Sequence, residues 1–452
     1  MALSVVILAA GMSTRFKSER PKVLHDLEER PMIDYTLDLA ARLALEPPVV
    51  VIGPEIEAEI QTWAGDRARY VLQRERLGTG HAVLQAAPVL RTTSEQVLVL
   101  YGDMPLLKED TLLQLARLQA ATDAAVAMLT VERDNPRGFG RILRRGGSGD
   151  ILGIVEEAEA TPEQRAIREL NVGIYVFEAG FLWDALPQIK PSARKGEYYL
   201  TDLVKMAVDA RREVVSVSID DPVEALGINT RADFAVAQAV MRQRVNEHWM
   251  LEGVTLVDAA TTYIGPNVVI GPDTTIHPNT HLRGQTVIGA GCDIGPNAII
   301  ENCTLGDRCR VLASVLEDAV MEDDSDIGPF GHLRKGSRLC QGAHMGNFGE
   351  MKQSTLGPGS KMGHMSYLGD TETGANVNIG AGTITCNYDG ERKHATVIED
   401  GAFIGSDTML VAPVRVGKGA TTGAGAVVTR DVPPGTIVYG VPARAKSEPP
   451  SE

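Results

Sequence analysis

The sequence has few aromatic residues and no long apolar run. Aromatic residues make up only 5% of the 452 residues, although the apolar share of 44% is that of a globular protein. No apolar stretch reaches the length that a transmembrane helix needs. The apolar start, residues 2–10, has neither a basic segment before it nor a cleavage site after it. It therefore predicts a first β-strand instead of a signal peptide, and we expect no membrane insertion.

The sequence also lacks paired cysteines and an excess of positive charge. None of its five cysteines forms a CxxC pair, and an odd number without metal-type spacing indicates buried thiols in a reducing compartment. The net charge of −15 argues against a nucleic-acid or anionic-membrane surface, although a local basic site can still bind phosphates. We therefore predict a cytoplasmic protein without nucleic-acid partners. The cysteines are Cys292, Cys303, Cys309, Cys340 and Cys386.

A six-residue repeat dominates the C-terminal half. An aliphatic residue stands at every sixth position from Ile264 to Ile300, often followed by Gly and Pro. This period fits neither an α-helix nor a simple hairpin sheet, but it is typical of the flat sides of a parallel β-helix. Gly supplies the turn conformations and Pro fixes φ beside it. We predict an all-β, left-handed parallel β-helix over residues 252–446, the fold typical of hexapeptide-repeat proteins.

The repeat is interrupted after Ile300 and resumes from Met321, from Leu356 and from Ile398. Interruptions in a solenoid become loops on one face, which is often the binding face. The largest one runs from Gly369 to Lys393. Because the flat sides of such prisms commonly pack about a threefold axis, we predict a homotrimer with sites between subunits.

The N-terminal half, residues 1–230, alternates apolar strands with amphipathic helices. This rhythm predicts an α/β domain with an open, mostly parallel sheet, whose ligand binds beyond the carboxyl ends of the strands. The loop after the first strand is neither a dinucleotide GxGxxG nor a P-loop. Strands are expected at 3–10, 49–53, 70–73, 96–100, 124–130 and 172–177, and helices at 34–45, 80–87, 110–120 and 201–209.

Two segments outside these domains have their own composition. Residues 231–251 contain neither Pro nor Gly and carry apolar residues at near-helical spacing, which predicts one amphipathic linker helix. The tail, residues 447–452, is rich in Pro and acidic residues and is predicted to be disordered.

Charged residues follow the first and the fourth expected strands. Arg15 and Lys22 are spaced to bring two cations to a polyphosphate beside the glycine-bearing loop. Asp103 follows a strand, where α/β sheets place metal ligands, and Mg²⁺ prefers one or two carboxylates plus phosphate oxygens. Taken alone, the cations fit a solvated surface loop better, and the aspartate fits a turn or a helix cap better.

Motifs in sequence order resemble the sugar-nucleotide pyrophosphorylases. They are Leu8-Ala-Ala-Gly11-x-x-Thr14-Arg15, Pro21-Lys22-Val-Leu, Gln73 with Leu77-Gly-Thr-Gly-His-Ala82, Tyr101-Gly-Asp103, Gly138-Phe-Gly-Arg-Ile142, Glu156, Asn171-Val-Gly-Ile174, Gly196-Glu-Tyr-Tyr-Leu-Thr-Asp202 and Gly227-Ile-Asn229. Over nearly the whole chain, the sequence resembles the GlmU family. Those proteins are bifunctional N-acetylglucosamine-1-phosphate uridylyltransferases and glucosamine-1-phosphate N-acetyltransferases.

The resemblance implies a role for each of these residues. Arg15 and Lys22 would neutralise the triphosphate of UTP as catalytic cations, and Asp103 and Asn229 would hold Mg²⁺. Gln73 offers a donor and an acceptor to a uracil edge, which fits. The residues implied in binding UTP or UDP-N-acetylglucosamine are Leu8, Ala9, Ala10, Gly11, Lys22, Gln73, Gly78, Thr79, Tyr101, Gly102, Asp103, Gly140, Glu156, Asn171, Tyr199, Thr201 and Asn229. Within this set, the residues that would hold the amino sugar are Gly140, Glu156, Asn171, Tyr199 and Thr201.

Two positions depart from the family pattern in this half. Ser13 stands where the phosphate loop usually has a second glycine, and Val172 stands where threonine often follows Asn171. The first change would alter the approach of the loop to phosphate, and the second removes one hydroxyl. Neither change removes a predicted metal ligand or cation.

The C-terminal half carries a second set of family motifs. They are Phe330-Gly-His-Leu-Arg334, Asn347-Phe-Gly-Glu-Met-Lys352, Gly363-His-Met-Ser-Tyr-Leu-Gly-Asp370 and Asn376-Val-Asn-Ile-Gly-Ala381. Acyl transfer to an amine needs a base near neutrality, which suits histidine, and a sugar phosphate needs Arg or Lys. By resemblance, His364 is the catalytic base, and Arg334, Lys352, Tyr367, Asn378 and Lys393 bind glucosamine-1-phosphate. Ala381, Asn387, Tyr388, Ser406 and Ala424 would bind acetyl-CoA.

The last turn of the solenoid matches less well. Some relatives carry an arginine near position 440 for the phosphates of coenzyme A, but this chain has Gly440 there, with Arg444 as a candidate substitute.

The leading hypothesis is thus acetylation of glucosamine-1-phosphate from acetyl-CoA, followed by uridylyl transfer from UTP to N-acetylglucosamine-1-phosphate with release of pyrophosphate. The product would feed peptidoglycan and lipopolysaccharide-type precursors. A second hypothesis keeps only the nucleotidyltransferase, with the solenoid as a trimerising or regulatory scaffold. A third makes the chain a non-enzymatic interaction protein, which the intact cations and metal ligands argue against.

Overall fold

A computed structural model of the chain describes residues 2–12, 14–134, 138–147, 149–193 and 195–446. Ser13 and the tail 447–452, about which the sequence makes predictions, lie outside the described residues. The chain divides into two compact units, Met1–Met241 and Arg242–Glu452.

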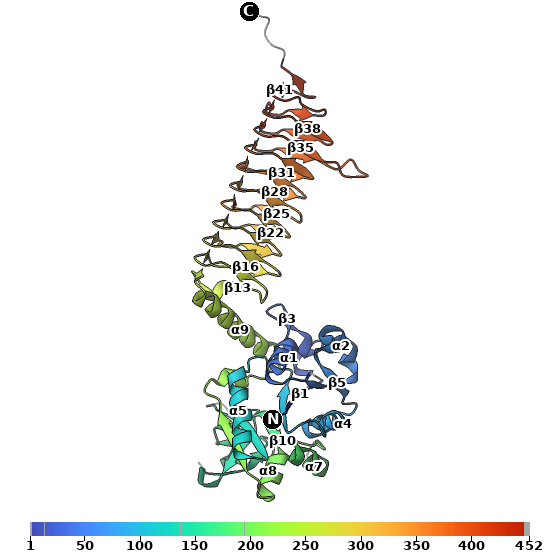
Figure 1. Cartoon of the computed structure of the whole chain (residues 1–452), viewed down its shortest axis with the longest axis vertical. Helices are drawn as coiled ribbons and strands as arrows, with labels where there is room; N and C mark the ends of the chain where they lie inside the picture. Colours follow the sequence, from blue (N-terminus) through green and yellow to red (C-terminus); the bar gives the residue numbers. More distant parts are fainter. Residues whose placement is uncertain (1, 13, 135–137, 148, 194, 447–452) are drawn as a thin grey trace, which may run out of the picture. The chain divides into compact units, whose positions relative to one another are not determined.

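The N-terminal unit is built on a nine-stranded mixed sheet with the order β11-β7-β10-β6-β1-β4-β5, to which β8 and β9 attach at β10 (Figure 1). Neighbours in this order run parallel except at β10, which is antiparallel to both β6 and β7. The strands are β1 Leu3–Ala9, β4 Val49–Ile52, β5 Arg69–Leu72, β6 Gln96–Tyr101, β7 Val126–Glu132, β8 Arg141–Arg144, β9 Ile151–Val155, β10 Glu169–Glu178 and β11 Val214–Ser218. A two-stranded ribbon, β2 Asp26–Leu27 with β3 Arg30–Pro31, stands apart from it.

Helices cover both faces of this sheet, so its central strands are apolar on both sides, as in α/β proteins. Alternate residues of β1 illustrate this, since Val5 and Ile7 face one core and Val6 and Leu8 face the other. The first core contains α1 (Met32–Leu43), α2 (Glu57–Ala64) and α5 (Glu109–Thr122). The opposite core contains α3 (Thr79–Leu84), α7 (Ala179–Ala185) and α8 (Asp202–Asp209). Two single-turn helices are α4 (Ala87–Leu90) and α6 (Pro162–Arg165).

The strands and helices expected in this half are present, with ends shifted by a few residues. The hairpin β8–β9 and the edge strand β11 were not expected, and neither were α2 and α7. The hairpin begins at the end of the motif Gly138–Ile142, since β8 starts at Arg141, and Gly153 interrupts the pattern of β9. The predicted helix over residues 231–251 is α9, Arg231–Leu251, and the division between the two compact units falls within it.

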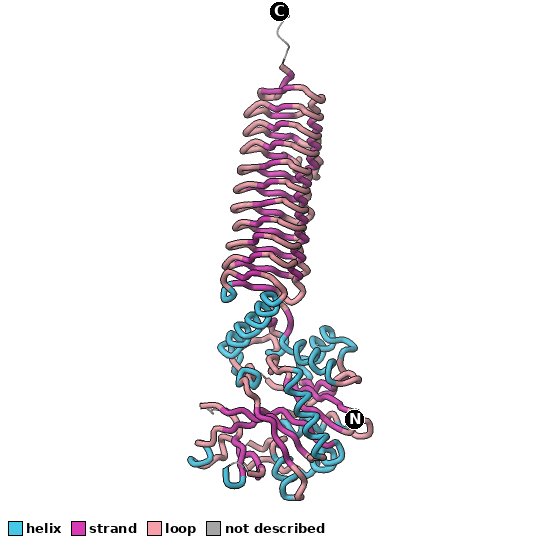
Figure 2. The backbone as a smooth tube through the Cα atoms, turned by 60° about the vertical axis from the view of Figure 1, so that its left-hand side comes forward, coloured by secondary structure: helices cyan, strands magenta, loops and turns pink. Residues whose placement is uncertain are grey.

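The C-terminal unit is a parallel β-helix of the left-handed hexapeptide type, whose short strands stack into three sheets (Figure 2). Sheet C has twelve strands from β12 (Thr255–Leu256) to β42 (Arg444–Ala445), sheet D has ten from β13 (Thr262–Ile264) to β40 (Val427–Val428), and sheet E has nine from β14 (Val269–Ile270) to β38 (Val414–Val416). All pairings are parallel except the last, between β41 (Ile437–Tyr439) and β42. The chain thus visits C, D and E once per coil.

The aliphatic residues of the six-residue repeat form the core of this unit. Ile276 pairs with Ile294 one coil later, and both are buried, as are the aliphatic residues at the resumed periods. One hexapeptide therefore supplies one side of the prism. The period slips in the sequence because several coils are one or two residues shorter than three hexapeptides, as between Ile294 and Val311.

The five cysteines all carry free thiols, but only four of them are buried. Cys386 is half-exposed because it stands at the end of β34 (Ile384–Cys386), just before the largest insert. The expectation of buried thiols is therefore wrong for this residue. No helix in the described residues is long and apolar enough to cross a membrane.

Candidate functional site

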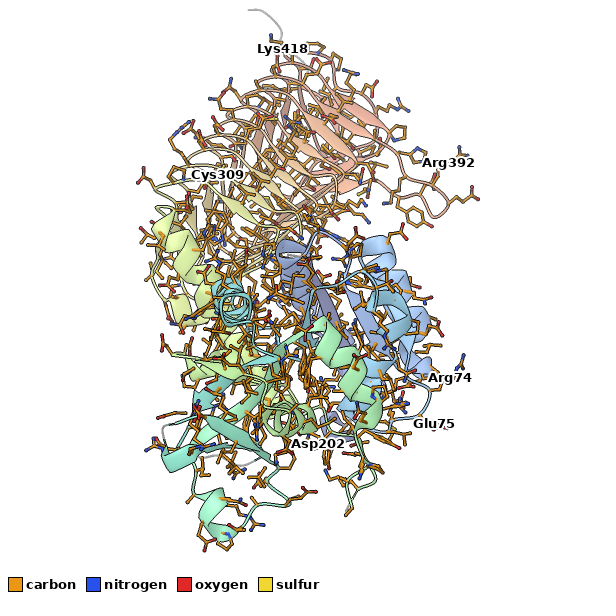
Figure 3. The ribbon with its side chains drawn as sticks, turned by 60° about the horizontal axis from the view of Figure 1, so that its bottom comes forward. Arg74, Glu75, Asp202, Cys309, Arg392 and Lys418 are labelled. Atoms are coloured by element: carbon orange, nitrogen blue, oxygen red, sulfur yellow. The ribbon has the colours of Figure 1, made fainter. Side chains whose placement is uncertain are left out.

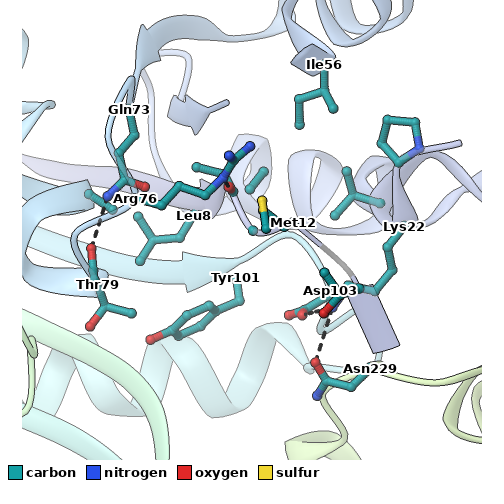
Figure 4. Close-up of a pocket in the computed structure, with 18 of the residues that line it drawn as sticks. Leu8, Met12, Lys22, Ile56, Gln73, Arg76, Thr79, Tyr101, Asp103 and Asn229 are labelled. Atoms are coloured by element: carbon teal, nitrogen blue, oxygen red, sulfur yellow. Dashed lines mark hydrogen bonds and ion pairs between the residues drawn. The ribbon is translucent and has the colours of Figure 1, made fainter. Parts of the chain in front are cut away.

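A cavity of about 540 Å³ lies at the carboxyl ends of β1 and β6, where the sheet topology predicts a ligand (Figure 4). The loop after β1, the segment after β5 and the residues after β6 form its walls. The predicted UTP residues that line it are Leu8, Ala9, Ala10, Gly11, Arg15, Lys22, Gln73, Gly78, Thr79, Tyr101, Asp103, Tyr199 and Asn229.

Two cations and two oxygen donors meet at one end of this cavity. The Lys22 ammonium lies 2.6 Å from Asp103 Oδ2 and 3.4 Å from Asn229 Oδ1. Arg15 donates to the same Asn229 oxygen at 3.0 Å. Lys22 is only 7% exposed, so these partners compensate its positive charge more than water does. The residues predicted to hold metal and phosphate are therefore brought together.

Asn229 is held in place by the start of α9. Its backbone N–H donates to the Asp233 carboxylate at 3.0 Å, and the next residue, Thr230, donates to the same oxygen. Ile228 donates to the carbonyl of Asp103 at 2.9 Å, which ties this turn to the end of β6. The two predicted metal ligands therefore share a fixed backbone frame, although they are far apart in the sequence.

The loop after β1 is fixed by a residue that the sequence analysis did not single out. Arg76 Nε donates to the carbonyl of Ala10 at 2.7 Å, and its guanidinium also pairs with Glu55. Gly102, which does not line the cavity, donates to the carbonyl of Leu8 at 3.0 Å. Arg76 follows Gln73 within the quoted motif, but nothing in its spacing shows that it turns toward the loop.

The segment from Leu77 to Thr79 forms the other end of the cavity. Hydrogen bonds join this segment to the chain before α8. Tyr198 donates to the carbonyl of Leu77 at 2.7 Å, and Leu200 donates to Thr79 Oγ1 at 3.0 Å. Gly78 has φ +102°, and a Cβ there would stand 2.7 Å from the carbonyl oxygen of Tyr198. Only glycine fits this position without displacing the backbone.

Beside the cavity, the predicted sugar residues form a second group. Glu156 accepts from the Thr201 hydroxyl at 3.2 Å, and burial raises the pKa of its carboxyl. Asn171 Oδ1 accepts from the Tyr175 hydroxyl at 2.9 Å, and the Asn171 backbone donates to the carbonyl of Gly140. The pKa of the Tyr101 phenol is also raised, first by burial and then by Asp103 and Glu156, so Tyr101 links this group to the cavity.

Further residues line the cavity that the site prediction missed. They are Met12, Thr14, Pro21, Val23, Ile56, Arg76, Ala82 and Glu197. Thr14, Pro21 and Glu197 lie inside the quoted motifs, whereas Ile56 enters from the turn before α2 and gives no signal in the sequence. Val172, where a hydroxyl is absent, is buried against the first core.

In the solenoid, the predicted base and part of the predicted acetyl-CoA set share one corner. The register of sheet C places Met362, Ile379, Ile404 and Thr422 one above another. Two residues after each of them, at the corner that leads into sheet D, stand His364, Ala381, Ser406 and Ala424. His364 is exposed and, in the described part of the chain, has no hydrogen-bond or ion-pair partner.

The predicted phosphate ligands lie at the other edge of sheet D. Arg334 and Lys352 stack in successive coils, and Lys393 comes from the insert. The pKa of Lys352 is lowered, chiefly by the positive charge of Lys393 and then by that of Arg334. Lys352 is therefore close enough to both Lys393 and Arg334 to be repelled by them. Glu350, which the site prediction missed, accepts from Arg334 at 2.8 Å.

The insert is shorter than the predicted 369–393, because the residues up to Cys386 belong to regular coils. It is a small hairpin between β34 and β35 (Thr396–Ile398), and Arg392 projects outward near its end (Figure 3). Tyr388 forms a bridge with Lys393, and the Tyr388 hydroxyl donates to the carbonyl of Gly390. Backbone N–H groups, first that of Arg392, and the His394 ring lower the pKa of the Asp389 carboxyl. Asn387, at the base of the hairpin, is buried and donates to Asp370 at 2.5 Å.

Not all predicted residues of the solenoid converge within one chain. Tyr367 is on sheet D, whereas Asn378 is on β33 (Asn378–Ile379) of sheet C, around the corner from Arg334 and Lys352. Gly440 lies in a turn with φ +93°. The Arg444 side chain is exposed and donates only to the neighbouring carbonyl of Ala443 among the described residues. It therefore has no fixed partner.

Comparison with known proteins gives a consistent result for both halves. Residues 5–170 match the MobA-like NTP transferase domain, and residues 267–302 and 395–430 match the bacterial transferase hexapeptide repeat. The chain is 48% identical to the bifunctional protein GlmU of Pelobacter propionicus, over 96% of this chain and 95% of that protein.

Two further curated relatives have the same name. The bifunctional protein GlmU of Geobacter metallireducens is 46% identical over 96% of this chain and 95% of its own length. That of Heliobacterium modesticaldum is 46% identical over 96% of this chain and 94% of its own length. A nucleotidyltransferase-type cavity, a hexapeptide solenoid and these relatives, which are matched along nearly their full length, lead to one conclusion: the chain belongs to the GlmU family.

Proposed function

We propose that the cavity at β1 and β6 and the face of sheet D are the two active sites of a bifunctional enzyme that makes UDP-N-acetylglucosamine. Its two reactions are acetyl transfer from acetyl-CoA to glucosamine-1-phosphate, and uridylyl transfer from UTP to N-acetylglucosamine-1-phosphate. The observation that carries the proposal is the meeting of Arg15, Lys22, Asp103 and Asn229 at one end of a cavity in a family member.

In the first site, Arg15 and Lys22 bind the triphosphate. The sugar-phosphate oxygen attacks the α-phosphorus and pyrophosphate leaves in line, so the protein contributes mainly placement and positive charge. The Arg76 hydrogen bond to Ala10 holds the loop in position for this. Uridine is bound at the end formed by Gln73, Gly78 and Thr79.

The same end of the cavity fits Mg²⁺. Asp103 and Asn229 offer a carboxylate and an amide oxygen, the hard donors that this ion prefers, and both already face a cation, the Lys22 ammonium. When bound, Mg²⁺ would add positive charge beside the phosphate oxygens. Lys22 would then give up Asp103 and turn its ammonium toward phosphate.

The amino sugar is bound by Gly140, Glu156, Asn171, Tyr199 and Thr201. Glu156 and Thr201 already hydrogen-bond to each other, which supports a polar pocket with fixed side-chain directions. A carboxyl with a raised pKa and an amide oxygen accept hydrogen bonds from sugar hydroxyls or from the acetamido N–H.

In the second site, Arg334, Lys352 and Lys393 bind the phosphate of glucosamine-1-phosphate, with Tyr367 and Asn378. Their mutual repulsion is relieved when an anion binds, which supports this assignment. His364 takes a proton from the attacking amine, and it has the exposure that this needs. Acetyl-CoA lies along the corner with Ala381, Ser406 and Ala424, near Asn387 and Tyr388.

The second site favours a homotrimer. His364 and the three cations lie on an exposed face, and Asn378 lies around the corner, so one chain supplies only an open wall of a site. A neighbouring copy packed against this wall would complete it. The free thiols fit a reducing, cytoplasmic environment, and the net negative charge favours small-molecule substrates over nucleic acid.

The test supplies purified protein with glucosamine-1-phosphate, acetyl-CoA, UTP and Mg²⁺, and follows free thiol and pyrophosphate separately. We expect thiol release with the first two substrates alone, and pyrophosphate release only when UTP is added. If pyrophosphate appears only with N-acetylglucosamine-1-phosphate and thiol never appears, the solenoid is a scaffold and the acetyltransferase assignment is wrong.

A further inference from the structure

The Gln73 side chain is fixed in one orientation at the edge of the nucleotide cavity. Its Nε2 donates to the carbonyl of Gly78 at 3.1 Å, the hydrogen bond drawn from Gln73 in Figure 4. A carbonyl oxygen only accepts, so the side-chain atom that faces Gly78 is the nitrogen. Gln73 is 4% exposed, so water does not replace a lost partner.

The same nitrogen also lies 3.1 Å from Nδ1 of His81, in the first turn of α3. With one N–H directed at Gly78, the other N–H faces the imidazole. Nδ1 accepts it only in a neutral ring that carries its proton on Nε2. The contact therefore selects one tautomer of His81 as well as one orientation of Gln73.

The other side of the ring agrees with a neutral histidine. The Gln85 amide nitrogen lies 3.2 Å from His81 Nε2 and donates to the His81 carbonyl at 3.0 Å. A ring protonated at both nitrogens would set N–H groups against amide nitrogens on both sides. A neutral ring has one acceptor nitrogen, so only one of the two glutamines donates to it. Gln85 is half-exposed and already donates to the His81 carbonyl, whereas the buried Gln73 has no water to replace this acceptor.

We propose that His81 is a positioning residue for base selection in the nucleotide cavity. By accepting from Gln73 Nε2, it leaves Gln73 Oε1 as the atom presented to the base. That oxygen accepts the N3–H of uracil, whereas the N3 of cytosine has no proton and would meet it with a lone pair. The inference rests on the proposed role of Gln73 in binding the base.

Three substitutions separate this role from a merely structural one. His81→Asn places its Oδ1 where Nδ1 stands, because both atoms are attached to Cγ, so it keeps an acceptor for Gln73. His81→Gln places its polar atoms near Nε2 and leaves Gln73 without an acceptor. His81→Leu removes both polar atoms but keeps an apolar side chain of comparable length beside Tyr198, whose ring centroid lies 6.5 Å from that of His81.

The readout is the preference for UTP over CTP, measured as the ratio of kcat/KM in pyrophosphate release. If CTP turns over too slowly for kcat/KM to be measured, the inhibition constant of CTP in the UTP reaction is measured instead. We expect His81→Asn to keep this ratio within about twofold, and His81→Gln and His81→Leu to lower it about tenfold, mainly through KM for UTP. An unchanged unfolding transition of the N-terminal unit, measured by calorimetry, checks that the same proteins are folded.

The inference is overturned if His81→Asn loses the preference, or if His81→Gln keeps it. A further variant, Gln73→Ala, distinguishes failure of this inference from failure of the proposed nucleotide site. If that variant also keeps the wild-type ratio, Gln73 does not contact the base, and the proposed nucleotide site is wrong along with the inference. If Gln73→Ala lowers the ratio and His81→Leu and His81→Gln do not, only the role of His81 is wrong.

Discussion

The two candidate sites differ in how their charges are arranged. In the N-terminal cavity, cations face anions and amide oxygens at hydrogen-bond distance, and Lys22 is nearly buried. On the solenoid, Arg334 has one carboxylate partner, while the half-buried Lys352 and the exposed Lys393 repel each other. The cavity is preorganised by its own domain, whereas the solenoid face depends on what binds to it.

The difference follows from the two folds. A doubly wound sheet brings loops from distant segments to one edge, so Asp103 and Asn229 meet although many residues separate them. In a β-helix each coil contacts only its neighbours, so the flat face gathers side chains of successive coils but cannot enclose a ligand. Chemistry on such a face needs an insert or a second copy.

The largest effect is expected for Asp103→Ala in the cavity. Removing this carboxylate leaves Lys22 without its 2.6 Å partner and takes away a proposed metal ligand. Pyrophosphate release should fall on the order of 10³-fold, as for the loss of a preorganised electrostatic group. Thiol release from acetyl-CoA, measured in the same tube, should not change. A parallel loss of both signals would mean that the two sites are not independent.

His364→Ala should have the next largest effect, on the solenoid alone. A positioned general base typically contributes about 10²- to 10⁴-fold, so thiol release should drop by that order while pyrophosphate release from N-acetylglucosamine-1-phosphate persists. His332→Ala is the matched control, since this histidine is on sheet D but pairs with Glu317. Equal losses in the two variants would remove His364 from the catalytic role.

Lys393→Ala tests the repulsion among the cations. The charge of Lys393 is the main cause of the lowered pKa of Lys352, so its removal should raise that pKa toward the ordinary value. NMR titration of labelled lysine side chains measures the shift. Because one phosphate ligand is lost, KM for glucosamine-1-phosphate should rise about tenfold. A lower KM would show that relief of repulsion outweighs the lost contact.

Gly78→Ala tests how rigid the wall of the cavity is. Its effect is expected on the free energy of unfolding. The positive φ and the contact with the Tyr198 carbonyl together should cost roughly 3 kcal/mol. Gly146→Ala, in the left-handed region (φ +63°, ψ 19°) and with open space around its Cβ position, should cost roughly 1 kcal/mol. Calorimetry, following the transition that UTP shifts, compares the two. Equal costs would mean that the loop yields to the added methyl group.

The sequence predicts most of the fold because two patterns in it are strong, the six-residue repeat and the alternation of strands and helices. The sixfold spacing from Ile264 to Ile300 leaves only a stack of short strands, and those residues are buried as expected. The α/β order is recovered as well, but the hairpin β8–β9, the edge strand β11 and the helices α2 and α7 are missed. In the hairpin, Gly153 breaks the alternation of β9.

Parts of the sites follow less directly from the sequence. Motif residues at the strand ends fall around the cavity because parallel strands share one edge. Arg76 and Glu350 were missed because a charged residue shows its partner only when the fold is known. The roles of the site residues, and the effects of Ser13, Val172 and Gly440, remain predictions.

The insert in the solenoid interrupts the sequence without interrupting the stack. Ile379 and Ile404 are hydrogen-bonded neighbours in sheet C although the whole hairpin from Asn387 to Ala395 lies between them in the chain. The corner between sheets D and E therefore accepts segments of different length at no cost to the register above and below it. For protein engineering, this corner is an exchange point, where a foreign loop can be grafted onto an unchanged column of coils.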